Sequence, residues 1–273
     1  FQPEVWQFEV APWPERVFGG RYPRSAARDQ REAMPPKYAT EVQTVINTLN
    51  DMKQPRVEWD CGTPGIGVLA SDSMMFQRGE PTPSDPHLGN FYGLAMPLLK
   101  RGLPVTPVQL ENVTVTNYLK GFRVLLLSYD GQKPLSPEVH APLADWVKQG
   151  GVLVVCDADA DPYLKVRDWW NSNGRSYATP REHLFEQLGI SKPVEHGKLQ
   201  TIGKGGLIWS HERPANCSAS VEGAARVVST TQQAVKAAGL KWRETNYLLL
   251  RRGPYVIGAG LNESISSAGH EVS

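Results

Sequence analysis

The sequence predicts an α/β fold in which helices cover both faces of a parallel β-sheet. Residues 124–127 and 152–155 are short, continuously apolar runs, which are typical of strands buried on both faces of a parallel sheet. Between them, Ser-Pro-Glu at 136–138 matches a helix start, with serine as the N-cap and proline at the first helical position. The helix that follows has one apolar face and stops at the glycine pair 150–151. A strand, a helix and a strand in this order form a right-handed parallel crossover unit, so the alternation predicts the sheet.

The remaining elements follow from the same kinds of pattern. Apolar residues recur at helical spacing in 38–52, and short apolar runs bounded by glycine, proline or polar residues mark the strands. Strands of the main sheet are predicted at residues 65–70, 105–110, 122–128 and 152–156, and a separate strand at 5–10. Helices are predicted at residues 38–52, 87–100, 137–149, 162–171, 180–188 and 224–238. Hairpins are predicted at residues 199–210 and 247–259, with turns at 203–205 and 252–254.

Composition excludes several classes of partner. The 273-residue chain has a formal net charge of +1 and no block of lysine and arginine, so no nucleic-acid partner is expected. No apolar run approaches the roughly 20 residues that span a bilayer, so no membrane partner is expected. The cysteines Cys61, Cys156 and Cys217 have no zinc, redox or disulfide spacing. The sequence therefore predicts neither a metal site nor a cofactor.

Three segments carry a resemblance to a known family. Residues 90–105 read NFYGLAMPLLKRGLPV, residues 119–128 read LKGFRVLLLS, and residues 143–154 read LADWVKQGGVLV. Over about residues 63–260 the chain resembles the glutamine-amidotransferase-like, flavodoxin-like domain that follows the catalytic barrel in family-42-type β-galactosidases and related glycoside hydrolases. The resemblance implies a flavodoxin-like sheet and an accessory domain of an enzyme that acts on a carbohydrate.

The same resemblance implies that the chain begins with the end of a (β/α)8 barrel. Active residues of such barrels lie at the C-terminal ends of strands. Glu9, at the end of the strand-like run, is then a candidate catalytic carboxylate or sugar-binding group, and Trp13 is a candidate stacking surface for a sugar ring. The alternative role for Glu9 is a structural ion pair with Arg16. The implied domains are 1–62 for the end of the barrel and a linker helix, 63–263 for the α/β domain, and 264–273 for the start of a following segment.

The resemblance and the exposed strand edges predict three partners. They are a carbohydrate, the catalytic barrel of the same polypeptide, and a second copy of the chain, because exposed strand edges favour association. The domain itself is expected not to catalyse the reaction, which would be hydrolysis of a glycosidic bond. The alternative is a stand-alone binding or sensor module with a small-molecule pocket at the C-terminal ends of the strands.

Polar side chains follow three of the predicted parallel strands, where open α/β sheets bind ligands. Asp72, Tyr129 and Asp157 are the candidate ligand-binding residues at this edge, together with Asp130. The alternative is that the edge packs against the barrel or against a neighbouring subunit.

Two more specific chemistries are not favoured. An active amidotransferase needs a cysteine on a sharp strand-to-helix turn with flanking glycines, whereas Asp157 follows Cys156. The alternate aspartates from 157 to 161 resemble a calcium loop, but Pro162 occupies the position that requires glycine. Asp161 is instead expected to cap the following helix, with a looser cation site as the alternative.

Overall fold

The computed structural model describes residues 36–51, 56–76, 88–191 and 193–261. These residues belong to two compact units. The first holds α4 (Pro36–Asp51) and the residues Arg252–Tyr255, and within it the Tyr255 hydroxyl donates a hydrogen bond to Asp51 at 3.2 Å. The second holds the α/β part of the chain. The predicted strand at 5–10, with Glu9 and Trp13, lies outside the described residues.

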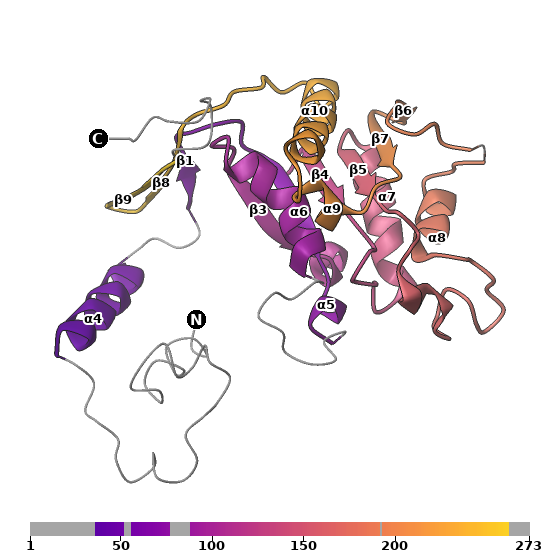
Figure 1. The fold of residues 1–273 in the computed structure, drawn as a ribbon, viewed down its shortest axis with the longest axis horizontal. Coiled ribbons are helices and arrows are strands. Elements are labelled where there is room, and N and C mark those ends of the chain that lie inside the picture. Colours follow the sequence, from indigo (N-terminus) through magenta and orange to yellow (C-terminus); the bar gives the residue numbers. More distant parts are fainter. Residues whose placement is uncertain (1–35, 52–55, 77–87, 192, 262–273) are drawn as a thin grey trace, which may run out of the picture. The chain divides into compact units, whose positions relative to one another are not determined.

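A six-stranded, mainly parallel sheet forms the centre of the second unit (Figure 1). Its order is β3-β2-β4-β5-β7-β6, and every neighbouring pair is parallel except β6 with β7. The strands are β2 (Ile66–Ala70), β3 (Val105–Gln109), β4 (Val124–Leu127), β5 (Val152–Cys156), β6 (Leu199–Ile202) and β7 (Gly205–Ser210). The four strands predicted for the parallel sheet are therefore confirmed. The predicted β6–β7 hairpin also forms, and β7 joins the sheet by pairing with β5.

Helices cover both faces of this sheet, as predicted. One face packs against α6, α9 and α10, and the other against α7 and α8 (Figure 1). Alternation along each strand divides the apolar side chains between the two layers: Leu126 of β4 faces the first group of helices and Leu127 the second. The helices are α5 (Ser73–Phe76), α6 (Leu88–Leu99), α7 (His140–Lys148), α8 (Pro180–Gln187), α9 (Pro214–Cys217) and α10 (Val221–Ala237).

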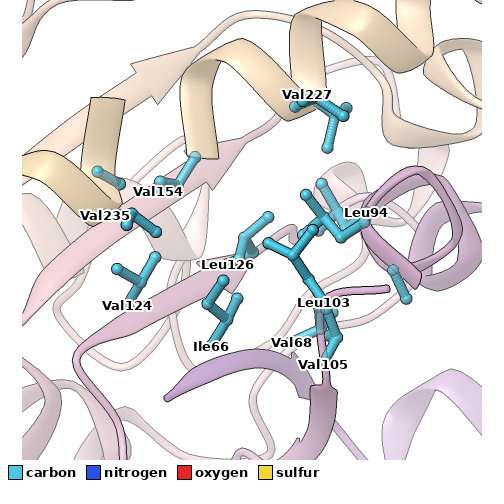
Figure 2. Close-up of a cluster of buried hydrophobic side chains, with 14 of the residues drawn as sticks. Ile66, Val68, Leu94, Leu103, Val105, Val124, Leu126, Val154, Val227 and Val235 are labelled. Carbon is cyan, nitrogen blue, oxygen red and sulfur yellow. The ribbon is translucent and has the colours of Figure 1, made fainter. Parts of the chain in front are cut away.

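Figure 2 shows the first of these two cores, where Leu94 of α6 and Val227 and Val235 of α10 face the strand side chains Val124 and Leu126. All of these side chains are almost completely removed from solvent. Burying one such side chain contributes about 1.5–3 kcal/mol, so the two apolar layers are a main source of the stability of the sheet. The buried charged side chains Asp130, Lys133 and Asp157 instead follow the ends of β4 and β5.

Local sequence explains most of the helix boundaries. The first turn after Ser136 is the 3₁₀ segment η2 (Pro137–Val139), and α7 continues from it to Lys148. Ser136 stands at the N-cap position, but its hydroxyl donates to Glu138 and accepts no capping hydrogen bond from the helix backbone. The start of α10 differs from the prediction by three residues, because the Ser220 hydroxyl accepts from the Gly223 amide at 3.0 Å and caps the helix.

The predicted helix at 162–171 is wrong. Only the 3₁₀ turn η3 (Pro162–Lys165) forms, and irregular backbone follows it. The Asn171 amide donates to the Leu164 carbonyl at 3.3 Å and to the Val166 carbonyl at 2.8 Å. Side-chain hydrogen bonds of this kind replace helical ones, which is why asparagine and aspartate are poor predictors of a helix interior.

A separate three-stranded sheet has the order β1-β8-β9. The short strand β1 (Glu58–Trp59) pairs antiparallel with β8 (Tyr247–Arg252), and β9 (Tyr255–Gly260) completes the predicted hairpin. In the described part of the chain, no helix combines the length and the apolar character needed to cross a membrane.

Candidate functional site

Buried polar and charged side chains gather at the C-terminal ends of the parallel strands. Tyr129 and Asp157 come from adjacent strands and meet there, with the Tyr129 amide donating to the Asp157 carboxylate at 2.9 Å. Asp130 lies beside them, and its carboxylate accepts from the Ala158 amide at 2.9 Å. The sheet topology thus brings together three of the predicted edge residues. Because parallel strands all end at one edge, this grouping could be predicted from sequence.

A buried ion pair closes part of this edge. The Lys133 ammonium lies 2.6 Å from the Asp161 carboxylate, and both side chains are at most 6% exposed. The ammonium also donates to the carbonyl of Tyr129, and the Gly131 amide donates to Asp161 at 2.8 Å. Burial opposes ionisation of Asp161, but the Lys133 charge and the donated hydrogen bonds outweigh it and lower the pKa of this carboxyl.

A serine network joins the end of β2 to the same lysine. The Ser71 hydroxyl donates to Glu111 at 2.6 Å, and the Ser73 hydroxyl donates to the Lys133 carbonyl at 2.5 Å. The Gln132 amide bridges the Leu69 and Ser128 carbonyls. These bonds tie the loop after β4 to the loop after β2. They use the polar groups internally, which favours a structural role for this side of the edge.

Asp72 stands apart from Tyr129 and Asp157. It is exposed, and its carboxylate accepts a hydrogen bond from the Gln109 amide at 2.9 Å. Of the residues predicted for a pocket at this edge, Asp72 is thus open to solvent, while Tyr129 and Asp157 are only 2% exposed each.

A second charged group closes the edge near β5 and β7. Arg181 of α8 forms a bidentate pair with Asp159, with distances of 2.6 and 2.7 Å. Its guanidinium lies over the Trp209 ring, 4.6 Å from the ring centroid. The Asp157 Oδ2 atom is 3.5 Å from Arg181 Nη1, near enough for attraction between charges. That oxygen has no hydrogen-bond partner among the described residues.

Burial makes the Asp157 carboxyl an unusually weak acid. Removal from water raises the pKa of this carboxyl to about 7, although Arg181 opposes the shift. Burial also raises the pKa of Asp130 from its ordinary value. Asp157 therefore changes its charge near neutral pH.

A hydrogen-bonded chain of aromatic side chains runs outward from Tyr129. The Tyr129 hydroxyl is 2.7 Å from His140 Nε2, and His140 Nδ1 is 2.8 Å from His183 Nδ1. His140 is fully buried, and His183 is partly exposed. Burial, aided by the neighbouring His183, lowers the pKa of His140 to about 3, so its imidazole is neutral at physiological pH.

Four residues of this edge were not among the predicted site residues: Lys133, Arg181, His140 and His183. Lys133 and Arg181 lie 28 and 22 residues from their partners Asp161 and Asp159. Lys133 follows a predicted strand, and Arg181 is at the start of a predicted helix. These positions were the one sequence signal that could have pointed to a site. Their partners depend on how the loops fold over the sheet.

Cys156 lies at the end of β5 and is 5% exposed. Burial raises the pKa of its thiol well above the ordinary value, and Cys217 and Asp157 act in the same direction. A thiol of this kind is a poor nucleophile at neutral pH.

We therefore expect Cys156 to resist modification in the folded protein. A thiol reagent at pH 7.5 should label Cys156 only after denaturation, as followed by mass spectrometry of the peptide that contains it. Labelling within minutes under native conditions would contradict this expectation, and Cys156→Ala serves as the control for assignment.

The described residues contain no group of three or more His, Cys, Asp or Glu side chains placed to hold a metal ion. In the acidic segment after β5, the Asp161 carboxylate accepts from the Tyr163 amide at 2.9 Å. This is the capping role predicted for Asp161.

Two surface hollows formed by described residues lie away from the strand ends. One, of about 400 Å³, lies between the end of α6 and the start of α10, and includes Lys100, Ser220 and Val228. The other, of about 550 Å³, lies along α10 and includes Gln232 and Trp242. Neither contains a predicted site residue.

No protein-family model matches the chain, and a search of the curated proteins finds no significant match.

Proposed function

We propose that the chain is an accessory α/β domain of a glycoside hydrolase, joined to the end of that enzyme's catalytic barrel, and that its own strand ends are structural. The parent enzyme would hydrolyse a glycosidic bond in a carbohydrate. Its contacts would be with the barrel of the same polypeptide and with a second copy of the chain.

The strand order supports the flavodoxin-like part of this proposal. When the five parallel strands are numbered along the chain, their spatial order is 2-1-3-4-5, which is the flavodoxin-like arrangement. The antiparallel β6 is added at one edge. This order is what the resemblance to the glutamine-amidotransferase-like domain implies.

The observation that carries the accessory role is the internal pairing of charges at the strand ends. Lys133 is paired with Asp161 and Arg181 with Asp159, so two cations that an active site would direct at a substrate are neutralised within the domain. The buried Cys156 thiol, with its raised pKa, also argues against amidotransferase-type catalysis.

The experiment compares this chain with the longer polypeptide that the proposal requires. We expect the purified chain to hydrolyse none of a panel of nitrophenyl glycosides, and the polypeptide extended upstream to hydrolyse at least one. In the extended polypeptide, Glu9→Gln should reduce kcat by at least tenfold if Glu9 lies in the site. A matched Glu195→Gln exchange, at an exposed carboxylate of the α/β domain, should leave kcat unchanged.

The outcomes separate the parts of the proposal. Hydrolysis by the chain alone would overturn the accessory role. Unchanged kcat in Glu9→Gln would assign Glu9 to the ion pair with Arg16 and leave the accessory role intact.

A binding or sensor module is the second candidate, and one observation favours it. Buried carboxyls with a pKa near 7 are concentrated at functional sites, and Asp157 is such a group. In this case, a library of small polar molecules would contain one that raises the melting temperature of the wild type but not of Asp157→Asn.

A further inference from the structure

The hydrogen-bonded chain from Tyr129 through His140 to His183 connects three elements. Tyr129 follows β4, His140 begins α7, and His183 lies in α8. Trp169 stands edge-on to both imidazoles, with ring centroids 5.6 and 5.5 Å away, and its indole donates to the Pro134 carbonyl at 2.8 Å. Water is therefore kept from the inner imidazole, while His183 is partly exposed.

One arrangement of protons satisfies all three groups. Burial raises the pKa of Tyr129 well above its ordinary value, so the hydroxyl stays protonated. It donates a hydrogen bond to His140 Nε2. His140 then carries its own proton on Nδ1, and this N–H donates a hydrogen bond to His183 Nδ1. His183 must accept at Nδ1, so its proton is on Nε2.

A second proton on His183 is incompatible with this arrangement. It would place N–H groups on both Nδ1 atoms, which lie 2.8 Å apart. To avoid the clash, His140 would have to move its proton to Nε2, and the Tyr129 hydroxyl would lose its acceptor. Release of His183 toward solvent would instead leave the buried His140 Nδ1–H without an acceptor. A buried donor without a partner costs about 1–3 kcal/mol, so either response to the second proton weakens the link between α7 and α8, and release also lets water solvate the imidazolium.

The charged and titratable groups around His183 do not hold an imidazolium in place. Burial and Arg175 lower the pKa of His183, while Glu186 opposes them. Glu186 is also engaged by the Tyr177 hydroxyl, and Glu182 accepts from the Ala178 amide at 2.7 Å. Both carboxylates therefore already accept hydrogen bonds from the segment that precedes α8.

We propose that the Tyr129–His140–His183 chain is a proton-operated latch, which fastens α8 to the start of α7 at neutral pH and releases it when His183 takes up a second proton. Because α8 also carries Arg181, release would loosen the pair with Asp159 at the strand ends. The latch thus couples the acidity of the surroundings to the order of this edge, whether or not the domain belongs to a glycoside hydrolase.

The first test is the tautomer of each histidine in the wild-type protein at pH 7.5, read from nitrogen chemical shifts. The proposal requires a proton on Nδ1 of His140 and on Nε2 of His183. The opposite tautomer on either ring would overturn it.

The second test is hydrogen exchange in α8, corrected for intrinsic rates, with α10 as the internal reference. Between pH 7.5 and pH 5, protection of α8 in the wild type should fall by about tenfold or more, since a released imidazole takes up a proton below about pH 6.5. In His183→Gln, whose side-chain oxygen still accepts from His140 but cannot be protonated, the fall should disappear. His196→Gln, which alters an exposed histidine, should behave as the wild type. A pH-independent α8 in the wild type, or the same fall in His183→Gln, would overturn the latch.

Discussion

Replacing Lys133 by methionine is expected to lower the free energy of unfolding by about 3–5 kcal/mol, because it leaves a buried carboxylate without its counter-ion. The ammonium lies 2.6 Å from Asp161 and also donates to the Tyr129 carbonyl, so the carboxylate loses its counter-ion and the carbonyl loses this donor. For a chain of this size the melting temperature should fall by about 10 °C. Chemical denaturation at pH 7.5 gives the measurement.

Two further variants show whether the ion pair is the cause. Lys198→Met removes an exposed lysine that lies 2.6 Å from Glu195, and should leave the unfolding free energy unchanged because solvent screens that pair. Lys133→Met combined with Asp161→Asn should recover part of the loss, since neither charge remains buried alone. Equal losses in Lys133→Met and Lys198→Met would contradict the account of this edge.

The second large effect is a pair of opposite pH dependences in Asp157 and His140. The folded-state pKa of Asp157 is raised to about 7, so the folded state binds more protons than the unfolded state. Its contribution to stability is complete below about pH 4 and is lost as the pH rises through 7. The folded-state pKa of His140 is lowered to about 3, so the unfolded state binds more protons. Its contribution is complete above about pH 6.5 and is lost as the pH falls toward 3.

Between pH 4.5 and 6.5 the two slopes nearly cancel in the wild type, and each variant should expose the other slope. Asp157→Asn should gain about 2 kcal/mol relative to the wild type as the pH rises across this interval. His140→Gln should lose about 2 kcal/mol relative to the wild type across the same interval. Urea denaturation at both pH values measures these differences. Parallel pH profiles in all three proteins would show that neither group titrates as its burial requires.

The parts of the fold that could be predicted are those that depend on residues close together in the sequence. The apolar runs at 124–127 and 152–156 are buried on both faces, and that environment selects continuous apolar sequence regardless of the rest of the chain. Because both strands are parallel, their end residues Tyr129 and Asp157 had to meet. Glu9 and Trp13 lie outside the described residues, and their roles stay predictions.

The parts that were missed depend on tertiary contacts. Nothing near Lys133 in sequence indicates that a turn 28 residues later supplies its carboxylate. The pairing of His140 with His183 likewise requires α7 and α8 to pack side by side. The predicted helix at 162–171 failed for a local reason: Asp161 before Pro162 resembled a helix start, but Asn171 bonds the carbonyls that a helix would use.

The most direct test of the accessory-domain proposal is the gene sequence upstream of the codon for Phe1. The proposal predicts an open reading frame that continues upstream and encodes repeated strand–helix units of a barrel, with the segment at 5–10 as one of its last strands. A frame that encodes no such repeats, or a stop codon directly upstream, would contradict the proposal and leave the binding module as the better account.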